Sequence, residues 1–385
     1  MFGSLPLGIL QLWHRKFRLL TATLGIAFAV ILVFMQMELK EALYASAVRY
    51  HEALGYDLIM LSPKTPHIVA ARGFPRNRLY QAQGIKGVSS VSPIYLGQAI
   101  WRHPSEPLNR RSIFVLGFDP DDRGFEKLLS PTVLQRLRLP YQVSYDRLAR
   151  PEFGPIGQMI DEGMTVRNQV NDSEFTVAGL HAIGSGFAIE GSIFTSDLNF
   201  QRMFPERSAS VIEFGLIHLD PGAAVEGVRR EILDALPKDI RVLTRKEFAQ
   251  LEIDHWSKAT PTGVVFGFGV VMGLFVGAII VYQILYSDVQ DHLQEYATLL
   301  AMGYPHRYLK VIVLQEALVL AILGFLPGLV LSVELFRLTA ESAHLPLEMS
   351  LNNALTVFAL TLGMCVFSGL LTLRRLRSVD PAEVF

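Results

Sequence analysis

Four long apolar runs constrain this chain more than any other feature of its sequence. Residues 19–37, 264–285 and 354–373 carry no charged side chain, and residues 311–335 are interrupted only near their two ends. Each run is close to the roughly 20 residues with which a helix crosses the hydrocarbon core of a bilayer. We therefore predict a multi-pass α-helical membrane protein with four membrane-spanning helices at these four places.

The composition agrees with membrane insertion and excludes some functions. The 385-residue chain is 50% hydrophobic and 18% charged, with a mean hydropathy of +0.32, which is more apolar than is usual for a globular protein. Its formal net charge of -1 gives no sign of a basic surface, so we predict no nucleic-acid partner. Cys365 is the single cysteine, which excludes a disulfide or a cysteine metal cluster within one chain.

The first apolar run has an alternative interpretation as a cleavable signal peptide. Such a peptide has an apolar region of about 7 to 15 residues, followed directly by small residues at a cleavage site. Here the one triplet of that kind, Ala45-Ser46-Ala47, lies beyond the charged Glu38 and Lys40. We therefore interpret the first run as a retained membrane span.

Residues 38–263 differ in kind from the runs on either side. They hold most of the charged residues of the chain and turn sequences such as SPKTP, GFDPDD and LDPG. Strand-like segments such as DLIML, SIFVLGF and FGLIHL occur beside the helical pattern AAVEGVRREILDAL, which leads into the strand-like IRVLT. We predict a large water-soluble α+β domain, inserted between the first and second spans, with helical stalks over 38–54 and 245–256.

This domain shows no motif for catalysis, a metal or a cofactor. Asp119, Asp121 and Asp122 lack the ligand spacing of a calcium loop and are interpreted as an acidic turn, and His51 has no second histidine to complete a zinc-protease helix. A GxSxG nucleophile motif is also absent. A triad of serine, histidine and aspartate is recognised by geometry, so it stays open at this point.

The segment between the second and third runs, residues 286–310, contains the pattern of a short amphipathic helix. Its apolar side chains recur at three- and four-residue spacing, and Gly303 with Pro305 supplies a stop. A stripe on so short a helix forms no core of its own, so it must rest on the membrane surface, on the chain's own spans or on another protein. We interpret it as a docking surface formed by Leu293, Tyr296, Ala297, Leu300 and Ala301.

Two spans carry residues that suggest further contacts. Gly269, Gly273 and Gly277 repeat every four residues, so one face of the second span permits close approach of another helix. Whether that helix belongs to the same chain or to a second copy stays open. Glu316 and Glu334 lie near the two ends of the third run, where charges commonly reach the membrane interface; a proton site at Glu316 is the alternative.

Lysine and arginine residues of the short segments predict the orientation. They occur in residues 1–18, 286–310 and 374–385, whereas the loop 336–353 contains only Arg337. Because positive residues favour the cytoplasmic side, we predict that both termini and the docking segment are cytoplasmic. The large domain and the loop 336–353 are then extracytoplasmic.

Together these features resemble the FtsX-like, MacB-type permeases of ABC transporters. The resemblance rests on four spans with a large domain after the first, on DHLQEYATLLAMGY at residues 291–304 and on DPAE at residues 380–383. It is greatest to the DevC-type permeases of cyanobacterial exporters. Where the wider family usually has arginines at the start of the docking segment, this chain has Asp288, Asp291 and His292.

The resemblance implies a function and a set of partners. A permease of this kind passes ATP-driven motion from a separate ABC ATPase subunit to its periplasmic domain. It would export a lipid-like or other substrate through a periplasmic adaptor and a TolC-like outer-membrane channel. The chain would pair with a second copy in the bacterial plasma membrane and would not itself be an enzyme. The ATPase-docking residues would be Leu293, Glu295, Tyr296, Ala297, Leu300, Ala301, Gly303 and Tyr304.

The sequence indicates no cofactor in this chain, and the resemblance allows two other functions. The chain has no GxxxxGK[ST] loop to hold phosphates, so we expect no cofactor in it and ATP in the partner subunit. Extraction of lipoproteins from the membrane and regulation of a cell-wall hydrolase are the alternative functions. A neighbouring adaptor gene would favour export, a neighbouring hydrolase gene would favour regulation, and a co-purifying lipoprotein would favour extraction.

Overall fold

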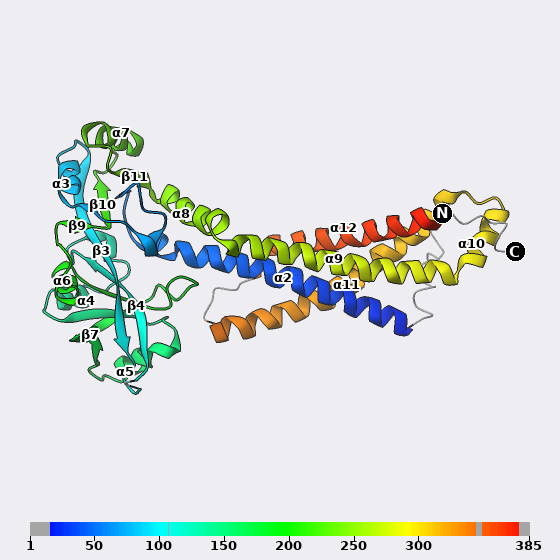
Figure 1. Cartoon of the computed structure of the whole chain (residues 1–385), viewed down its shortest axis with the longest axis horizontal. Coiled ribbons are helices and arrows are strands. Elements are labelled where there is room, and N and C mark those ends of the chain that lie inside the picture. Colours follow the sequence, from blue (N-terminus) through cyan, green and yellow to red (C-terminus); the bar gives the residue numbers. More distant parts are fainter. Residues whose placement is uncertain (1–15, 107, 344–348, 377–385) are drawn as a thin grey trace. The chain divides into compact units, whose positions relative to one another are not determined.

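The computed structural model describes residues 16–106, 108–343 and 349–376, and it forms two compact units (Figure 1). The helical unit consists of the residues before Leu43 and most of those after Thr260. The α/β unit consists mainly of Leu43–Thr260. The DPAE sequence and the residues up to Arg15 lie outside the described part of the chain.

Four helices of the described residues are long and apolar enough to cross a membrane. Each contains one of the four predicted spans, so the prediction of four membrane-capable helices is confirmed. A short fifth helix, α10, follows α9 in the sequence and precedes α11. The bounds are α2 Lys16–Ala53, α9 Pro261–Asp291, α10 Leu293–Ala301, α11 His306–Ala343 and α12 Leu351–Leu376.

Helix α2 packs tightly inside the helical unit. Ile26 and Val30 are buried, and both face glycines of α11. A Cβ atom on Gly324 would lie 2.4 Å from Ile26 Cβ, and one on Gly328 would lie 2.7 Å from Val30 Cγ1. Small residues thus bring α11 close to α2, as is common between membrane helices.

The α/β unit is built on a nine-stranded mixed sheet in the order β11-β1-β10-β3-β4-β8-β5-β7-β6. A separate pair is formed by β2 and β9. The bounds are β1 Leu58–Leu61, β2 Phe74–Pro75, β3 Val88–Arg102, β4 Arg110–Phe118, β5 Gln142–Asp146, β6 Arg167–Val170, β7 Ser173–His181, β8 Ser192–Ser196, β9 Val211–Ile212, β10 Phe214–Leu219 and β11 Arg241–Thr244.

The long strand β3 links two parts of this sheet. Its first half pairs with β10 and its second half with β4. Trp101 near its end also pairs with Val170 of β6. The strands in the sheet order β3-β4-β8-β5-β7-β6 therefore form a closed ring of paired strands. The predicted β–α–β order near the end of the domain is confirmed as β10, α7 and β11, with β1 lying antiparallel between the two strands.

Alternation along β4 explains why the sheet has a core on each face. Ile113 and Val115 belong to one buried cluster, whereas Phe114, Leu116 and Phe118 belong to another, because successive side chains of a strand point to opposite faces.

The remaining helices are α3 Asn77–Gln83, α4 Pro131–Leu137, α5 Ile156–Asp161, α6 Asp197–Met203, α7 Val225–Ala235 and α8 Arg245–Asp254, with short turns η1 Ile68–Ala70, η2 Arg123–Phe125, η3 Pro151–Phe153 and the π-helical η4 His255–Ala259.

The two predicted stalks are helical. Helix α2 runs without a break to Ala53 and covers the first of them. Helix α8 covers most of the second, and it begins with a capping box in which the side chains of Thr244 and Glu247 bind each other's backbone N–H groups. The π-helical turn His255–Ala259 follows α8 and precedes α9.

Candidate functional site

Helix α10 forms as the sequence predicts and ends at its glycine. Gly303 has a φ of +90°, the left-handed region that glycine adopts without strain. The N–H of Tyr304 donates to the carbonyl of Leu299 at 3.1 Å, which is the closing bond of a Schellman motif. The predicted glycine stop is therefore present, and it turns the chain toward α11.

The inner side of α10 packs on the chain's own helices. Tyr296 is only 2% exposed and Ala297 is also buried. Tyr296 lies in a cluster with side chains of α9, α11 and α12, namely Val289, Leu309, Ile312, Val313 and Leu373. These two side chains are covered within the chain, so their predicted role as ATPase contacts stays a prediction, and the exposed side of α10 is the one that another protein can reach. The spacing that marks a docking stripe also marks a helix packed on its own spans.

The outer side of α10 and the turn after it carry the exposed residues of this segment. Glu295 and Gly303 are exposed, as predicted for docking residues, and Tyr304 is 47% exposed. Met302 is 63% exposed and was not predicted, because it lies off the stripe; its place as an apolar residue next to the helix stop was the available signal. Leu293 is half-buried. The side chains of Leu300 and Ala301 lie outside the described ones.

An arginine of α2 holds the acidic residues at the end of α9. Arg18 Nη2 lies 2.7 Å from Asp291 Oδ2, and its Nη1 lies 3.4 Å from Asp288 Oδ1. His292 Nδ1 lies 2.9 Å from the backbone oxygen of Asp288. These three residues stand where the resembling family usually has arginines. Two of them thus bind a cation of the chain itself, next to the start of α10.

The glycine face of α9 also packs inside the chain. A Cβ on Gly269 would lie 2.4 Å from Gln36 Cδ. One on Gly277 would lie 2.8 Å from Ala29 Cβ and 2.5 Å from Met364 Sδ. Gly273 is in similar contact with α2. Helix packing at these glycines is therefore present, but the partners are α2 and α12 of the same chain, so this face is not available to a second copy.

The α/β unit brings together a serine, a histidine and an aspartate that the sequence did not indicate. His181 Nδ1 lies 2.9 Å from Ser144 Oγ and its Nε2 lies 3.1 Å from Ser192 Oγ, while Ser192 donates to Asp146 Oδ2 at 3.4 Å. All four residues are buried, and burial lowers the pKa of His181 to about 4. His181 stacks on Phe194 and is inaccessible to a substrate. The network therefore joins β5, β7 and β8 rather than performing catalysis.

The carboxylates of the acidic turn at Asp119–Asp122 accept hydrogen bonds from neighbouring groups of the chain. Asp119 Oδ1 accepts the N–H of Asp121 at 3.0 Å, and Asp122 Oδ1 lies 3.0 Å from His218 Nε2. Asp122 also caps η2 by accepting the N–H of Gly124. Among the described residues, no group of three or more metal-ligand side chains is positioned to hold a metal ion.

Glu252 near the end of α8 holds two segments of the α/β unit together. Its Oε2 accepts the N–H of Ile68 at 2.9 Å, and its Oε1 accepts Trp256 Nε1–H at 3.2 Å. Burial raises the pKa of Glu252 to about 7. The ring of His255 stacks on that of His67 with centroids 4.2 Å apart. His255 and Trp256, interpreted from the sequence as stalk or interface residues, thus pack within their own unit.

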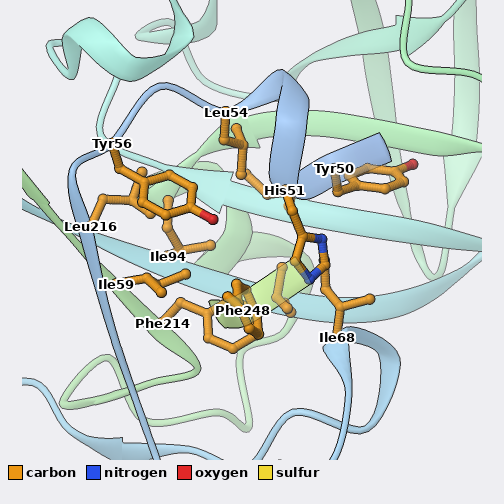
Figure 2. Close-up of a pocket in the computed structure, with 12 residues that line it drawn as sticks. Tyr50, His51, Leu54, Tyr56, Ile59, Ile68, Ile94, Phe214, Leu216 and Phe248 are labelled. Carbon is orange, nitrogen blue, oxygen red and sulfur yellow. The ribbon is translucent and has the colours of Figure 1, made fainter. Parts of the chain in front are cut away.

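A small cavity lies between the end of α2 and the sheet (Figure 2). His51 and Tyr56 border it, and the His51 ring packs on Phe248 with centroids 4.2 Å apart. Its free volume is about 10 Å³, which is room for about one water molecule. This cavity is therefore too small for a transported substrate.

The described residues form four membrane-capable helices, with a large mixed α/β domain after the first of them. Residues 267–381 match the family model described as the FtsX-like permease C-terminal domain. That range includes most of α9 and all of α10, α11 and α12. The match to this family model therefore lies in the helical unit of the chain.

Two curated relatives match part of the chain. They are uncharacterized ABC transporter permeases of Mycobacterium tuberculosis strains CDC 1551 and H37Rv, and each is 32% identical over 110 residues. The match covers 29% of this chain and 30% of the length of each relative. The chain thus aligns with about a third of the length of the curated relatives that it matches.

Two solved structures are similar to part of the chain. The periplasmic region of MacB from Actinobacillus actinomycetemcomitans covers 52% of this chain and 94% of its own, at 11% identity and a TM-score of 0.37. The extracellular domain of the ABC-type transporter YknZ from Gram-positive bacteria covers 49% of this chain and 99% of its own, at 10% identity and a TM-score of 0.34.

Proposed function

We propose that this chain is the membrane subunit of an ABC transporter of the FtsX and MacB type, and that it transmits motion from a separate ATPase subunit to its α/β domain. The observation that carries the proposal is the position of α10. This helix lies inside the FtsX-like permease domain, it is packed firmly on one side, and it exposes Met302 and Tyr304 on the other. The ATPase would bind that exposed side.

The packed side of α10 supports its role in transmission. Tyr296 belongs to a buried cluster with side chains of three membrane-capable helices, and Arg18 ties the end of α9 to the start of α2. A push on α10 would therefore reach α2, α9, α11 and α12 together. Helix α2 is continuous from Lys16 to Ala53, so it is the segment through which such a displacement would pass along the chain to the α/β domain.

The proposed surroundings are the bacterial plasma membrane, with both termini and α10 in the cytoplasm and the α/β unit outside it. Export through a periplasmic adaptor and an outer-membrane channel is the function that we favour, with two copies of the chain acting together. The glycine face of α9 is covered within the chain, so a second copy would have to bind elsewhere.

A crosslinking experiment tests the ATPase contact. A photoreactive phenylalanine analogue in place of Tyr304 should capture an ABC ATPase subunit in membranes of the native host. The same analogue at Tyr80, which is 45% exposed in the α/β unit, is the matched control and should not capture it. If the analogue captures the ATPase at neither site, and an ATPase that co-purifies with the chain is crosslinked at another position, the proposal is overturned. Capture of an adaptor, a hydrolase or a lipoprotein at Tyr80 would distinguish export, regulation and extraction.

The orientation is tested by labelling with a membrane-impermeant thiol reagent. Cys365 is fully buried, so new cysteines can be placed at the exposed residues Gln294 and Asp220. We expect labelling in intact cells at position 220 and, only after permeabilisation, at position 294. Equal labelling of the two in intact cells would contradict the proposed topology. Gly303 is unsuitable for this purpose, because its left-handed backbone would strain a cysteine.

A further inference from the structure

Glu316 of α11 is a buried carboxyl group without a hydrogen-bond partner. It is 0% exposed, and neither of its carboxyl oxygens has a partner among the described residues. It follows Ile312 and Val313 by about one helical turn, and these two side chains belong to the same buried cluster as Tyr296 of α10. Buried carboxyl groups are normally paired or hydrogen-bonded, so this one needs a separate explanation.

The groups around Glu316 make an ionised carboxylate unfavourable there. Tyr296 is buried and its hydroxyl also lacks a partner among the described residues. Burial, followed by the charges of Glu316, Asp288 and Glu295, raises the pKa of Tyr296 above its ordinary value. A negative charge on Asp288 also disfavours a second one on Glu316, because like charges repel each other.

No cation among the described residues offsets a charge on Glu316. Arg18 is bound to Asp288 and Asp291, and His292 lies against Asp288. From α12, Gly369 faces the neighbouring Ala317, and residues 351–373 of that helix contain no acidic or basic side chain. A buried charge without a partner costs several kcal/mol or more, so a proton on Glu316 is the simplest way to satisfy the site.

We propose that Glu316, together with Tyr296 and Asp288, forms a proton-binding site that controls the packing of α10. With the proton bound, the neutral carboxylic acid and the phenol lie side by side, and α10 stays on α11. When the proton leaves, the new carboxylate must reach water, and the helix carrying Tyr296 must move outward. The site belongs to the chain alone, so its test does not involve an ATPase and does not depend on the proposed function.

The proton itself is tested by infrared spectroscopy on the purified full-length chain in detergent. At neutral pH the wild-type spectrum minus that of Glu316→Gln should show the carbonyl stretch of a protonated carboxylic acid, because other buried carboxyl groups such as Glu252, whose pKa is raised to about 7, cancel in this difference. Glu316→Gln should lose that band while it keeps the same shape and neutrality, so it should also fold. Glu334→Gln is the control, because Glu334 is on the same helix but is exposed and paired with Arg337. A difference spectrum without this band, or an equal band in the difference between the wild type and Glu334→Gln, would overturn the proposal.

The movement of α10 is tested by thiol labelling in a Cys365→Ser background. Ala297 is buried and Gln294 is exposed on the same helix, so the ratio of the labelling rates of Ala297→Cys and Gln294→Cys cancels the pH dependence of the thiol. We expect this ratio to rise about tenfold per pH unit once the proton leaves, and to stay constant after Glu316→Gln. A ratio that rises equally in both backgrounds, or that follows sodium concentration instead of pH, would contradict the proposal.

Discussion

The side-chain amide of Asn353 in α12 donates a hydrogen bond of 2.9 Å to the carboxylate of Glu38 in α2. Glu38 directly follows the first predicted span and Asn353 directly precedes the fourth. At the other ends of the helices, Arg18 before the first span binds Asp291 after the second. Each contact joins two residues that a chain crossing the membrane four times would place on the same side. The helical unit is thus consistent with the predicted topology.

The hydrogen bond between Asn353 and Glu38 should stabilise the helical unit. Both residues are buried, so Asn353→Ala would leave the carboxylate without this donor and cost about 1 to 3 kcal/mol. We expect a lower unfolding temperature for the chain in detergent. Asn352→Ala is the control, because the neighbouring Asn352 is exposed. Equal unfolding temperatures for the two variants would contradict this account.

The pair formed by Arg18 and Asp291 should tie the start of α2 to the end of α9. A double-mutant cycle with Arg18→Gln and Asp291→Asn measures their coupling free energy, which we expect to be about 0.5 kcal/mol or more. Partial exposure limits it, because both side chains are reached by solvent. Additive effects of the two changes on stability would show that the pair is not coupled.

The glycines of α9 should be required for folding within the chain and not for pairing of two copies. Gly277→Val would overlap with Ala29 and Met364, and overpacking typically costs about 1 to 3 kcal/mol. Gly267→Val is the matched control, since a Cβ there meets nothing within 4 Å. We expect lower stability only for Gly277→Val, measured by thermal unfolding in detergent. A stable but monomeric Gly277→Val variant would instead assign this face to a second copy.

The buried Glu252 should make the stability of the chain depend on pH. Its pKa is raised to about 7 from an ordinary value of 4.5, so the folded state keeps a proton that the unfolded state has lost between these values. The contribution of Glu252 to stability is therefore present at low pH and is lost as the pH rises toward 7, by roughly 3 kcal/mol. His181 acts in the opposite sense, because its pKa is lowered to about 4 from 6.5, and it favours folding as the pH rises through that range.

The effect of Glu252 is separated from that of His181 by substitution. Glu252→Gln keeps an acceptor for the N–H of Ile68 and removes the titration. Relative to the wild type, this variant should gain stability between about pH 5 and about pH 8 in thermal unfolding. Glu226→Gln is the control on an exposed residue. A constant difference between Glu252→Gln and the wild type over this range would disprove the raised pKa.

Local patterns allowed much of this fold to be predicted from the sequence. The predicted strand FGLIHL agrees with β10 residue for residue, and SIFVLGF lies wholly within β4, because a buried strand requires a short apolar run between turn residues. The helix α10 and its end at Gly303 were likewise predictable, since helix periodicity and a glycine stop act over a few residues.

Contacts between distant segments could not be predicted in the same way. The stripe containing Tyr296 has the same spacing whether it binds another protein or the chain's own spans, so its burial was not foreseen. The network of Ser144, His181 and Asp146 depends on the order of β5, β7 and β8 in the sheet. Nothing in the local sequence of these three strands reports which strands are neighbours.

The most direct test of the central claim is retention of the ATPase by variants of the exposed side of α10. Met302→Asp combined with Tyr304→Asp alters two exposed side chains, so the chain should still fold. If the ATPase buries the side chains of Met302 and Tyr304, replacing both should weaken its binding by ~4 kcal/mol, or roughly a thousandfold.

The matched control is Met164→Asp with Tyr80→Asp, because these residues of the α/β unit are 44% and 45% exposed. The quantity measured is the amount of ATPase subunit that co-purifies with the tagged chain. Our account predicts that the Met302 and Tyr304 variant loses the ATPase, whereas the control keeps it. Retention of the ATPase by both variants at the wild-type level would contradict the claim that α10 is the docking helix.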